Sequence, residues 1–179
     1  MPKRTKKVEI APPRADSLLE SSRSYGYDLS TALSDIVDNS ITACANNIWI
    51  LQDWNETSSI IGIIDDGKGL SENSLREAMR LGSVSPSEER DDGDLGRFGL
   101  GMKTASLSQC RRVTVASKEK DEIHTRCWDI DYVKKTGKWT LQTSYDNHCS
   151  KFIDRLKALS TGTAVIWQNL DRIIPSEES

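Results

Sequence analysis

The chain has 179 residues, of which 36% are apolar and 28% are charged, and its formal net charge is −3. These values predict one folded domain with a hydrophobic core. The negative net charge argues against a domain that binds duplex nucleic acid through its overall electrostatic field. A local basic patch remains compatible with this charge. The four cysteines form no C-x-x-C pair, and the sequence has no apolar signal or membrane-spanning segment. We therefore expect a cytoplasmic protein with reduced thiols and no membrane partner.

The first 14 residues, MPKRTKKVEIAPPR, are basic and contain three prolines. They predict a flexible N-terminal arm, which is either a solvated tail or a contact for nucleic acid or another partner. Residues 15–179 are interpreted as a single domain without internal repeats.

Hydrophobic periodicity and turn residues divide this domain into helices and strands. Helices are expected at 16–24, 29–45, 71–80, 100–108 and 150–159, and strands at 47–53, 58–66, 111–118, 121–130, 138–143 and 162–170. The first two strands predict an antiparallel hairpin, and the segment 82–98 is polar and rich in Gly, Ser and Asp. The expected fold class is α+β, a two-layer sandwich in which helices cover one face of a mixed β-sheet.

The helix expected at 29–45 has two different faces. Asp35, Asn39 and Thr42 lie within about 60° of one another at 100° per residue. A polar face is most often only solvated, yet asparagine is a poor helix former, and a carboxylate stacked over a carboxamide can orient a water beside a metal ion. The opposite face predicts a core-facing stripe of Leu29, Leu33, Ile36, Val37, Ile41 and Cys44.

The apolar strand IIGII ends in Asp65-Asp66-Gly67-Lys68-Gly69. Such a sequence is typical of a plain turn, because Asp and Gly supply side-chain caps and positive φ angles. It is also compatible with a ligand site, since the small glycines let a flat ligand approach the backbone while Asp65 accepts a hydrogen bond from it.

The stretch GDLGRFGLGMKTAS is similar to a phosphate-binding P-loop but departs from it. Gly96 and Gly101 have the P-loop spacing, whereas the lysine comes one residue late, at Lys103. The segment before these glycines is polar and acidic, where a P-loop follows a buried strand. The glycines therefore need another explanation.

Four motifs occur in order: D-x-x-x-N on a helix, D-x-G-x-G after a strand, G-x-x-G-x-G opening a helix, and Gly162-Thr163 at the start of a late strand. In this combination the chain resembles the ATP-binding domain of the GHKL superfamily, the Bergerat fold of gyrase B, the heat-shock chaperone of ninety kilodaltons, MutL and histidine kinases. The resemblance covers residues 28–168 and, in motif style, is closest to the MutL and MORC branches. It implies a mobile ATP lid at about 82–98.

The resemblance implies ATP and Mg²⁺ as ligands. Asn39 would hold Mg²⁺, Asp65 would accept the exocyclic amine of adenine, and Thr163 would support Asp65 directly or through water. The base and sugar would lie close to Gly67 and Gly69 and pack against Leu70.

The same resemblance accounts for the second glycine motif. The phosphates would face backbone N–H groups of the lid and of the helix that follows it. Lys103 would either help to neutralise the phosphates or be exposed. The phosphate-facing residues would be Gly96, Gly99, Leu100 and Gly101.

Two features depart from the family pattern. The general base is usually Glu, but this chain has Asp35, whose carboxylate is one methylene, roughly 1.5 Å, shorter in reach; Asp38 is a rival candidate. Thr42 replaces a position that is commonly acidic. In related proteins a lysine that reaches the γ-phosphate comes from a following domain, so we expect this chain to be an N-terminal module of a longer protein.

Three functional classes follow from these observations. The first is a slow, Mg²⁺-dependent ATPase that acts as a conformational switch, with ATP-dependent homodimerisation in the full-length protein and a DNA or protein partner bound by regions outside this chain. The second is an ATP sensor that does not hydrolyse the nucleotide because Asp35 no longer activates water. The third, a histidine kinase catalytic domain, is disfavoured because the chain lacks a dimerising helical segment with a phosphoacceptor histidine.

Overall fold

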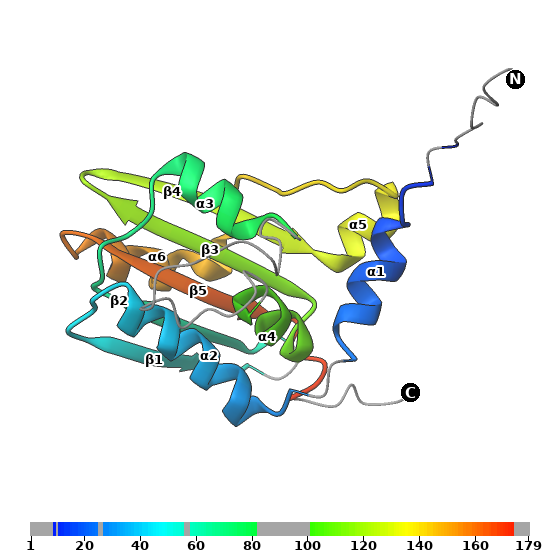
Figure 1. Ribbon diagram of the computed structural model, residues 1–179. Coiled ribbons are helices and arrows are strands. Elements are labelled where there is room, and N and C mark those ends of the chain that lie inside the picture. Colours follow the sequence, from blue (N-terminus) through cyan, green and yellow to red (C-terminus); the bar gives the residue numbers. More distant parts are fainter. Residues whose placement is uncertain (1–8, 10, 25–26, 56–57, 82–100, 174–179) are drawn as a thin grey trace, which may run out of the picture.

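The computed structural model describes residue 9 and residues 11–24, 27–55, 58–81 and 101–173 (Figure 1). Most of the expected N-terminal arm and the whole expected lid, with Gly96, Gly99 and Leu100, lie outside the described residues. In chain order the elements are α1 (Ala15–Ser22), α2 (Leu29–Thr42), β1 (Ile48–Asp53), β2 (Ile60–Asp65), α3 (Glu72–Met79), α4 (Gly101–Gln109), β3 (Arg112–Glu119), β4 (Glu122–Asp129), α5 (Ile130–Thr136), the short 3₁₀ helix η2 (Asn147–Cys149), α6 (Ser150–Lys157) and β5 (Gly162–Gln168).

The five strands form one sheet in the order β1-β2-β5-β3-β4. The last strand, β5, lies between two hairpins and pairs Thr163 with Asp65 on one side and with Ser117 on the other. The α+β fold class is thereby confirmed. The sheet is not mixed, however, because β5 runs antiparallel to both of its neighbours and the two hairpin pairs among the described strands are antiparallel as well.

The sheet is covered on both faces, whereas the sequence predicts helices on one face only. Figure 1 shows α2 and α4 in front of the sheet and α6 behind it. On the far face, Phe152 and its neighbours in α6 pack against Ile60 and Ile64 of β2. Gly62 leaves room for this ring, since an ideal Cβ at that position would lie 2.2 Å from Phe152 Cδ1. Burial on both faces explains why β2 is an uninterrupted apolar run.

The region after β4 differs from its expected structure. Residues 130–136 form α5, which begins where the Asp129 carboxylate accepts the Tyr132 N–H and ends at Gly137, whose φ is 65°. The strand expected at 138–143 is reduced to a single bridge between Cys127 and Gln142. Next to this bridge, the ring of Trp139 packs edge-on against the ring of Trp128, with 6.2 Å between the two ring centroids.

The buried stripe of α2 is rotated from its expected position. Ala32, Ile36 and Ser40 are buried, whereas Ile41 is 54% exposed and Cys44 is exposed. The helix packs chiefly against α4. Small side chains on the buried stripe let the two helices approach closely, a preference that an apolar pattern alone does not reveal.

The N-terminal helix α1 is held to the domain by a buried arginine. Arg23 donates from Nε to the Leu107 carbonyl of α4 at 2.9 Å and from Nη2 to Asp171, just after β5. Arg111 adds bonds to Glu20 of α1 and Asp131 of α5. These contacts make α1 an integral part of the domain.

Candidate functional site

A pocket of about 560 Å³ opens between α2, α3 and the start of α4, with the ends of β2 and β5 at its base. Its walls are mostly apolar, and its polar groups come from a few motif residues. The predicted site residues that line it are Asn39, Asp65, Gly69, Leu70, Gly101 and Thr163. The pocket thus brings together residues that are far apart in the sequence, from Asn39 to Thr163, and that belong to all four motifs.

Asp65 ends β2 at the base of the pocket and is only 5% exposed. Its Oδ2 accepts the Ser40 hydroxyl at 3.0 Å, and its Oδ1 accepts the Gly67 N–H at 2.9 Å. Burial raises the pKa of this carboxyl, and the hydrogen bonds from Gly67 and Ser40 act in the opposite direction. The two bonds also fix the orientation of the carboxylate relative to the pocket.

The glycines after Asp65 are required by the protein's own packing. An ideal Cβ on Gly67 would lie 2.8 Å from the Ala43 Cβ at the end of α2. Gly69 has a φ of 69°, and its Cβ would lie 2.0 Å from the Lys118 carbonyl. The loop is therefore held tightly between α2 and β3, which presents Leu70 to the pocket.

A hydroxyl pair supports the base of the pocket from β3 and β5. The hydroxyls of Ser117 and Thr163 lie 2.8 Å apart, and the Ser117 hydroxyl also accepts the Leu70 N–H at 2.8 Å. This pair connects the loop after Asp65 to two neighbouring strands. Ser117 and Ser40 are not among the residues singled out from the sequence, because neither position stands out by pattern.

Asn39 lies one helical turn after Asp35, on the polar face of α2. The Asn39 side-chain amide donates to the Asp35 backbone carbonyl at 2.7 Å. No described residue donates to its Oδ1, so this oxygen is available to accept a bond at the wall of the pocket.

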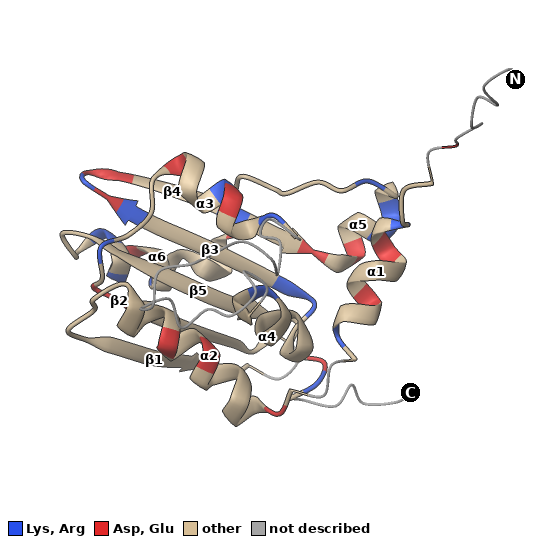
Figure 2. Ribbon diagram, viewed as in Figure 1, with Lys and Arg blue, Asp and Glu red and all other residues tan. Residues whose placement is uncertain are grey.

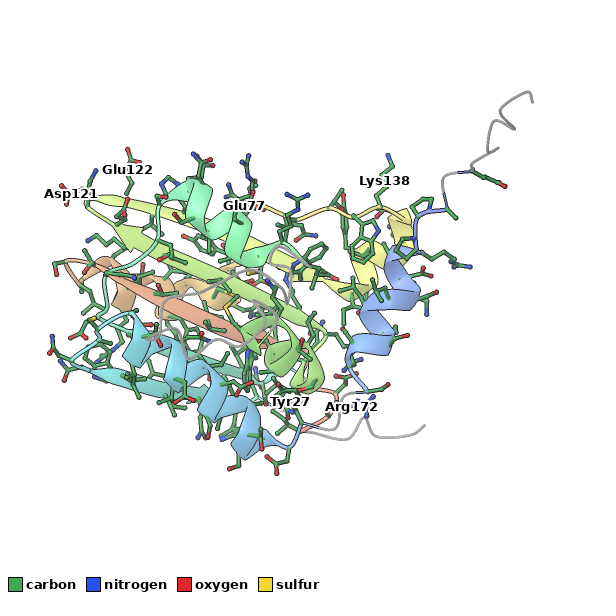
Figure 3. All side chains as sticks on the ribbon, in the orientation of Figure 1. Tyr27, Glu77, Asp121, Glu122, Lys138 and Arg172 are labelled. Atoms are coloured by element: carbon green, nitrogen blue, oxygen red, sulfur yellow. The ribbon has the colours of Figure 1, made fainter. Side chains whose placement is uncertain are left out.

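Two carboxylates on α2, the red bands on this helix in Figure 2, are candidate bases. Asp35 lies against the start of α4, where an ideal Cβ on Gly101 would be 3.7 Å from its Oδ2. Burial, and then the neighbouring Asp35 carboxylate, raises the pKa of Tyr27, which is labelled just before α2 in Figure 3. Asp38 is exposed and makes no such contact with a described residue. The surroundings favour Asp35.

Lys103 occupies neither of its expected positions, at the phosphates or in solvent. The residue is 1% exposed, and its ammonium donates to the carbonyls of Ala78 at 2.7 Å and Arg80 at 2.8 Å, at the end of α3.

The described residues thus form an α+β domain with an apolar pocket, a buried carboxylate at its base and an asparagine on its wall, an arrangement that suits a flat ligand with a polar edge. Residues 27–163 match the family of histidine kinase-, DNA gyrase B- and HSP90-like ATPases. The chain belongs to this family. No curated protein matches the sequence significantly. Membership implies ATP binding and, in general, an ATPase- or kinase-type activity.

The helices of the described part of the chain were also compared with the length and hydropathy that a membrane span requires. None of them is long and apolar enough to cross a bilayer.

Burial lowers the pKa of Lys103 from its ordinary 10.5 to about 8. Between these values the unfolded chain binds more protons at this residue than the folded chain does, so the contribution of Lys103 to the free energy of unfolding should rise with pH. It is complete above the unfolded pKa and is lost as the pH falls through the folded pKa. We expect a rise on the order of 2 kcal/mol in the difference between the wild type and Lys103→Met, measured by urea unfolding at about pH 7 and about pH 10.

The exposed Lys134 of α5 provides the control for this measurement. Lys134→Met should show no comparable change between the two pH values. An equal difference between the wild type and Lys103→Met at both values would mean that burial does not lower the pKa of Lys103.

Proposed function

We propose that this domain binds Mg²⁺–ATP and hydrolyses it slowly. The observation that carries the proposal is the buried, hydrogen-bonded carboxylate of Asp65 at the base of an apolar pocket of about 560 Å³. A pocket of this kind suits a flat heterocycle that offers one hydrogen-bond donor at its edge. Family membership supports ATP as that ligand.

In this proposal Asp65 accepts the exocyclic amine of adenine, and Thr163, paired with Asp65 across β2 and β5, supports it. Leu70 packs against the base, and the tight loop of Gly67 and Gly69 keeps this wall in position. Guanine presents a carbonyl where adenine has its amine, so a carboxylate at this point favours ATP over GTP.

Asn39 is the residue proposed to hold Mg²⁺. Its Oδ1 is a hard oxygen on a rigid helix, with its amide nitrogen already bonded to the Asp35 carbonyl. One protein oxygen suits Mg²⁺, which usually keeps several waters and takes further ligands from the phosphates of its nucleotide. When bound, the ion would neutralise phosphate charge.

The N-terminus of α4 is the proposed phosphate-facing element. Gly101 is its first residue and lines the pocket, and its backbone N–H suits an anion at a helix start. Gly96, Gly99 and Leu100 belong to the same proposed phosphate site and lie outside the described residues.

Asp35 is the proposed general base. It lies beside Gly101 and one turn from Asn39, so a water between the phosphates and α2 would be within its reach. One observation favours a second candidate function, an ATP sensor without turnover: the Asp35 side chain is one methylene shorter than Glu.

The biological role proposed for the domain is a conformational or dimerisation switch. ATP binding would promote homodimerisation within a larger machine in the cytoplasm, with DNA or a protein as its partner. The motifs DNSITA and GRFGLGMKTAS support a place near the MutL and MORC branches.

The adenine assignment predicts the behaviour of Asp65→Asn. An amide cannot accept hydrogen bonds through both of its polar atoms, so the variant leaves a buried polar group unpaired, at about 1–3 kcal/mol. ATP affinity should therefore fall by about 10- to 100-fold, measured by calorimetry. The wild type should bind ATP more tightly than GTP, and equal affinities would refute base recognition by Asp65.

The metal assignment predicts that Asn39→Ala removes the Mg²⁺ dependence of ATP binding, because alanine offers no oxygen ligand. Calorimetric titrations with and without Mg²⁺ measure this dependence. Asn46→Ala is the control, since Asn46 is exposed and, among the described residues, only its backbone N–H forms a hydrogen bond. If Asn39→Ala responds to Mg²⁺ as the wild type does, the ion is held elsewhere.

Asp35 distinguishes the ATPase from the sensor. Asp35→Ala in the full-length protein should retain ATP binding and lose turnover by about 10²- to 10⁴-fold, the usual contribution of a general base. Asp38→Ala, on the same helix, is the matched control and should keep its activity. Asp35→Glu should hydrolyse ATP at least as fast as the wild type if the pocket has room. Binding without turnover in both the wild type and Asp35→Glu would replace the ATPase with the sensor.

A further inference from the structure

The last carbonyls of α3 are bound by two buried side chains from different elements. Lys103 of α4 donates to the carbonyls of Ala78 and Arg80, and the indole N–H of Trp128, at the end of β4, donates to the Met79 carbonyl between them at 2.7 Å. Carbonyls at a helix C-terminus have no partner within the helix and carry partial negative charge. A lysine and an indole N–H complete this end of α3, and we call the Lys103 part of it the α3–α4 clamp.

The clamp connects two walls of the nucleotide pocket. Gly101 and Met102, directly before Lys103, line the pocket from α4, and Ala78, whose carbonyl accepts the first clamp bond, lines it from α3. Glu77, labelled on α3 in Figure 3, lines the same wall. A shift of either helix would therefore change the width of the pocket.

This clamp is costly for a purely structural device. Lys103 is 1% exposed and none of the described carboxylates pairs with it, so among the described residues only backbone carbonyls offset the loss of hydration. Burial lowers its pKa accordingly. Replacing a buried charge by an apolar side chain of similar size is often neutral or stabilising. Stability alone does not explain a lysine at this position.

We propose that Lys103 is a positioning residue of the nucleotide site, which acts by holding the end of α3 against the start of α4 so that both walls keep the spacing that binds ATP. The proposal rests on the proposed ATP-binding function, and it assigns Lys103 to α3 rather than to the phosphates. A residue that only caps a helix would mainly affect stability. Loss of Lys103 should instead reduce the affinity for ATP more than it reduces the stability of the fold.

The chain offers a matched control on the other face of the sheet. Lys118 of β3 donates to the carbonyls of Lys157, at 2.9 Å, and Leu159, at 2.6 Å, at the end of α6. It makes the same two bonds to a helix C-terminus. However, α6 packs on the face of the sheet opposite the pocket, and none of its residues lines the pocket.

The test compares Lys103→Met with Lys118→Met by calorimetry with Mg²⁺–ATP and by thermal unfolding. We expect at least a tenfold loss of ATP affinity for Lys103→Met with little loss of stability, and less than a twofold change in affinity for Lys118→Met. Both fold-changes are read at a temperature at which all the proteins are folded.

A spectroscopic signal reports on the clamp itself. The indole N–H of Trp128 bonds to the Met79 carbonyl between the two clamp bonds, so its NMR signal, identified with Trp128→Phe, should move in Lys103→Met and stay in place in Lys118→Met. If Lys103→Met does not fold, the test is amide hydrogen exchange of the wild type, measured with and without Mg²⁺–ATP. Mg²⁺–ATP should then protect the amides of α3 and α4 together, and protection of α4 alone would overturn the proposal.

The outcomes separate the two levels of the proposal. If the wild type does not bind Mg²⁺–ATP, the proposed function fails. If the wild type binds and Lys103→Met binds equally well, the function stands and the positioning role is overturned. Equal losses of affinity in Lys103→Met and Lys118→Met also overturn it, because a general weakening of helix ends would then explain the effect.

Discussion

The burial of the Asp65 carboxylate is the constraint on which the rest of the pocket depends. Removing a carboxylate from water costs several kcal/mol unless hydrogen bonds replace its hydration. Ser40 of α2 and the Gly67 N–H supply these bonds, so α2 must lie close to the end of β2. The rotated stripe of α2, with Ala32 and Ser40 buried, follows from this requirement. One polar group at the end of a strand thus determines how the neighbouring helix packs.

The same close approach explains the glycines of the D-x-G-x-G motif. The loop after Asp65 lies between the end of α2 and the backbone of β3, and a side chain at Gly67 or Gly69 would collide with one or the other. Their absence of a Cβ therefore serves the protein's packing before it serves any ligand. The glycines of this motif are therefore needed for the close packing of the loop against α2 and β3, in addition to any role in ligand binding.

Lys103 and Lys118 make the same interaction with a helix C-terminus, but the desolvation cost of the ammonium differs between them. Both cap a helix C-terminus with two bonds to carbonyls. Lys118 does so at the edge of the domain, where solvent reaches it, whereas Lys103 does so in the interior, where no carboxylate of the described residues pairs with it. The buried cap lies between the walls of the pocket. Natural proteins commonly retain such costly groups where function requires a defined geometry.

The sequence by itself determined the α+β class, most of the elements and the residues that meet at the pocket, because periodicity and turn chemistry are local properties and the ordered motifs mark the site. Motif order and spacing suffice to name Asn39, Asp65, Gly101 and Thr163 as pocket residues. Only the tertiary structure decided that β5 runs antiparallel to both neighbours, that α6 covers the second face, and that Lys103 points to α3. These features depend on which elements meet in space, and a hydrophobic pattern specifies that a face is buried without specifying its partner.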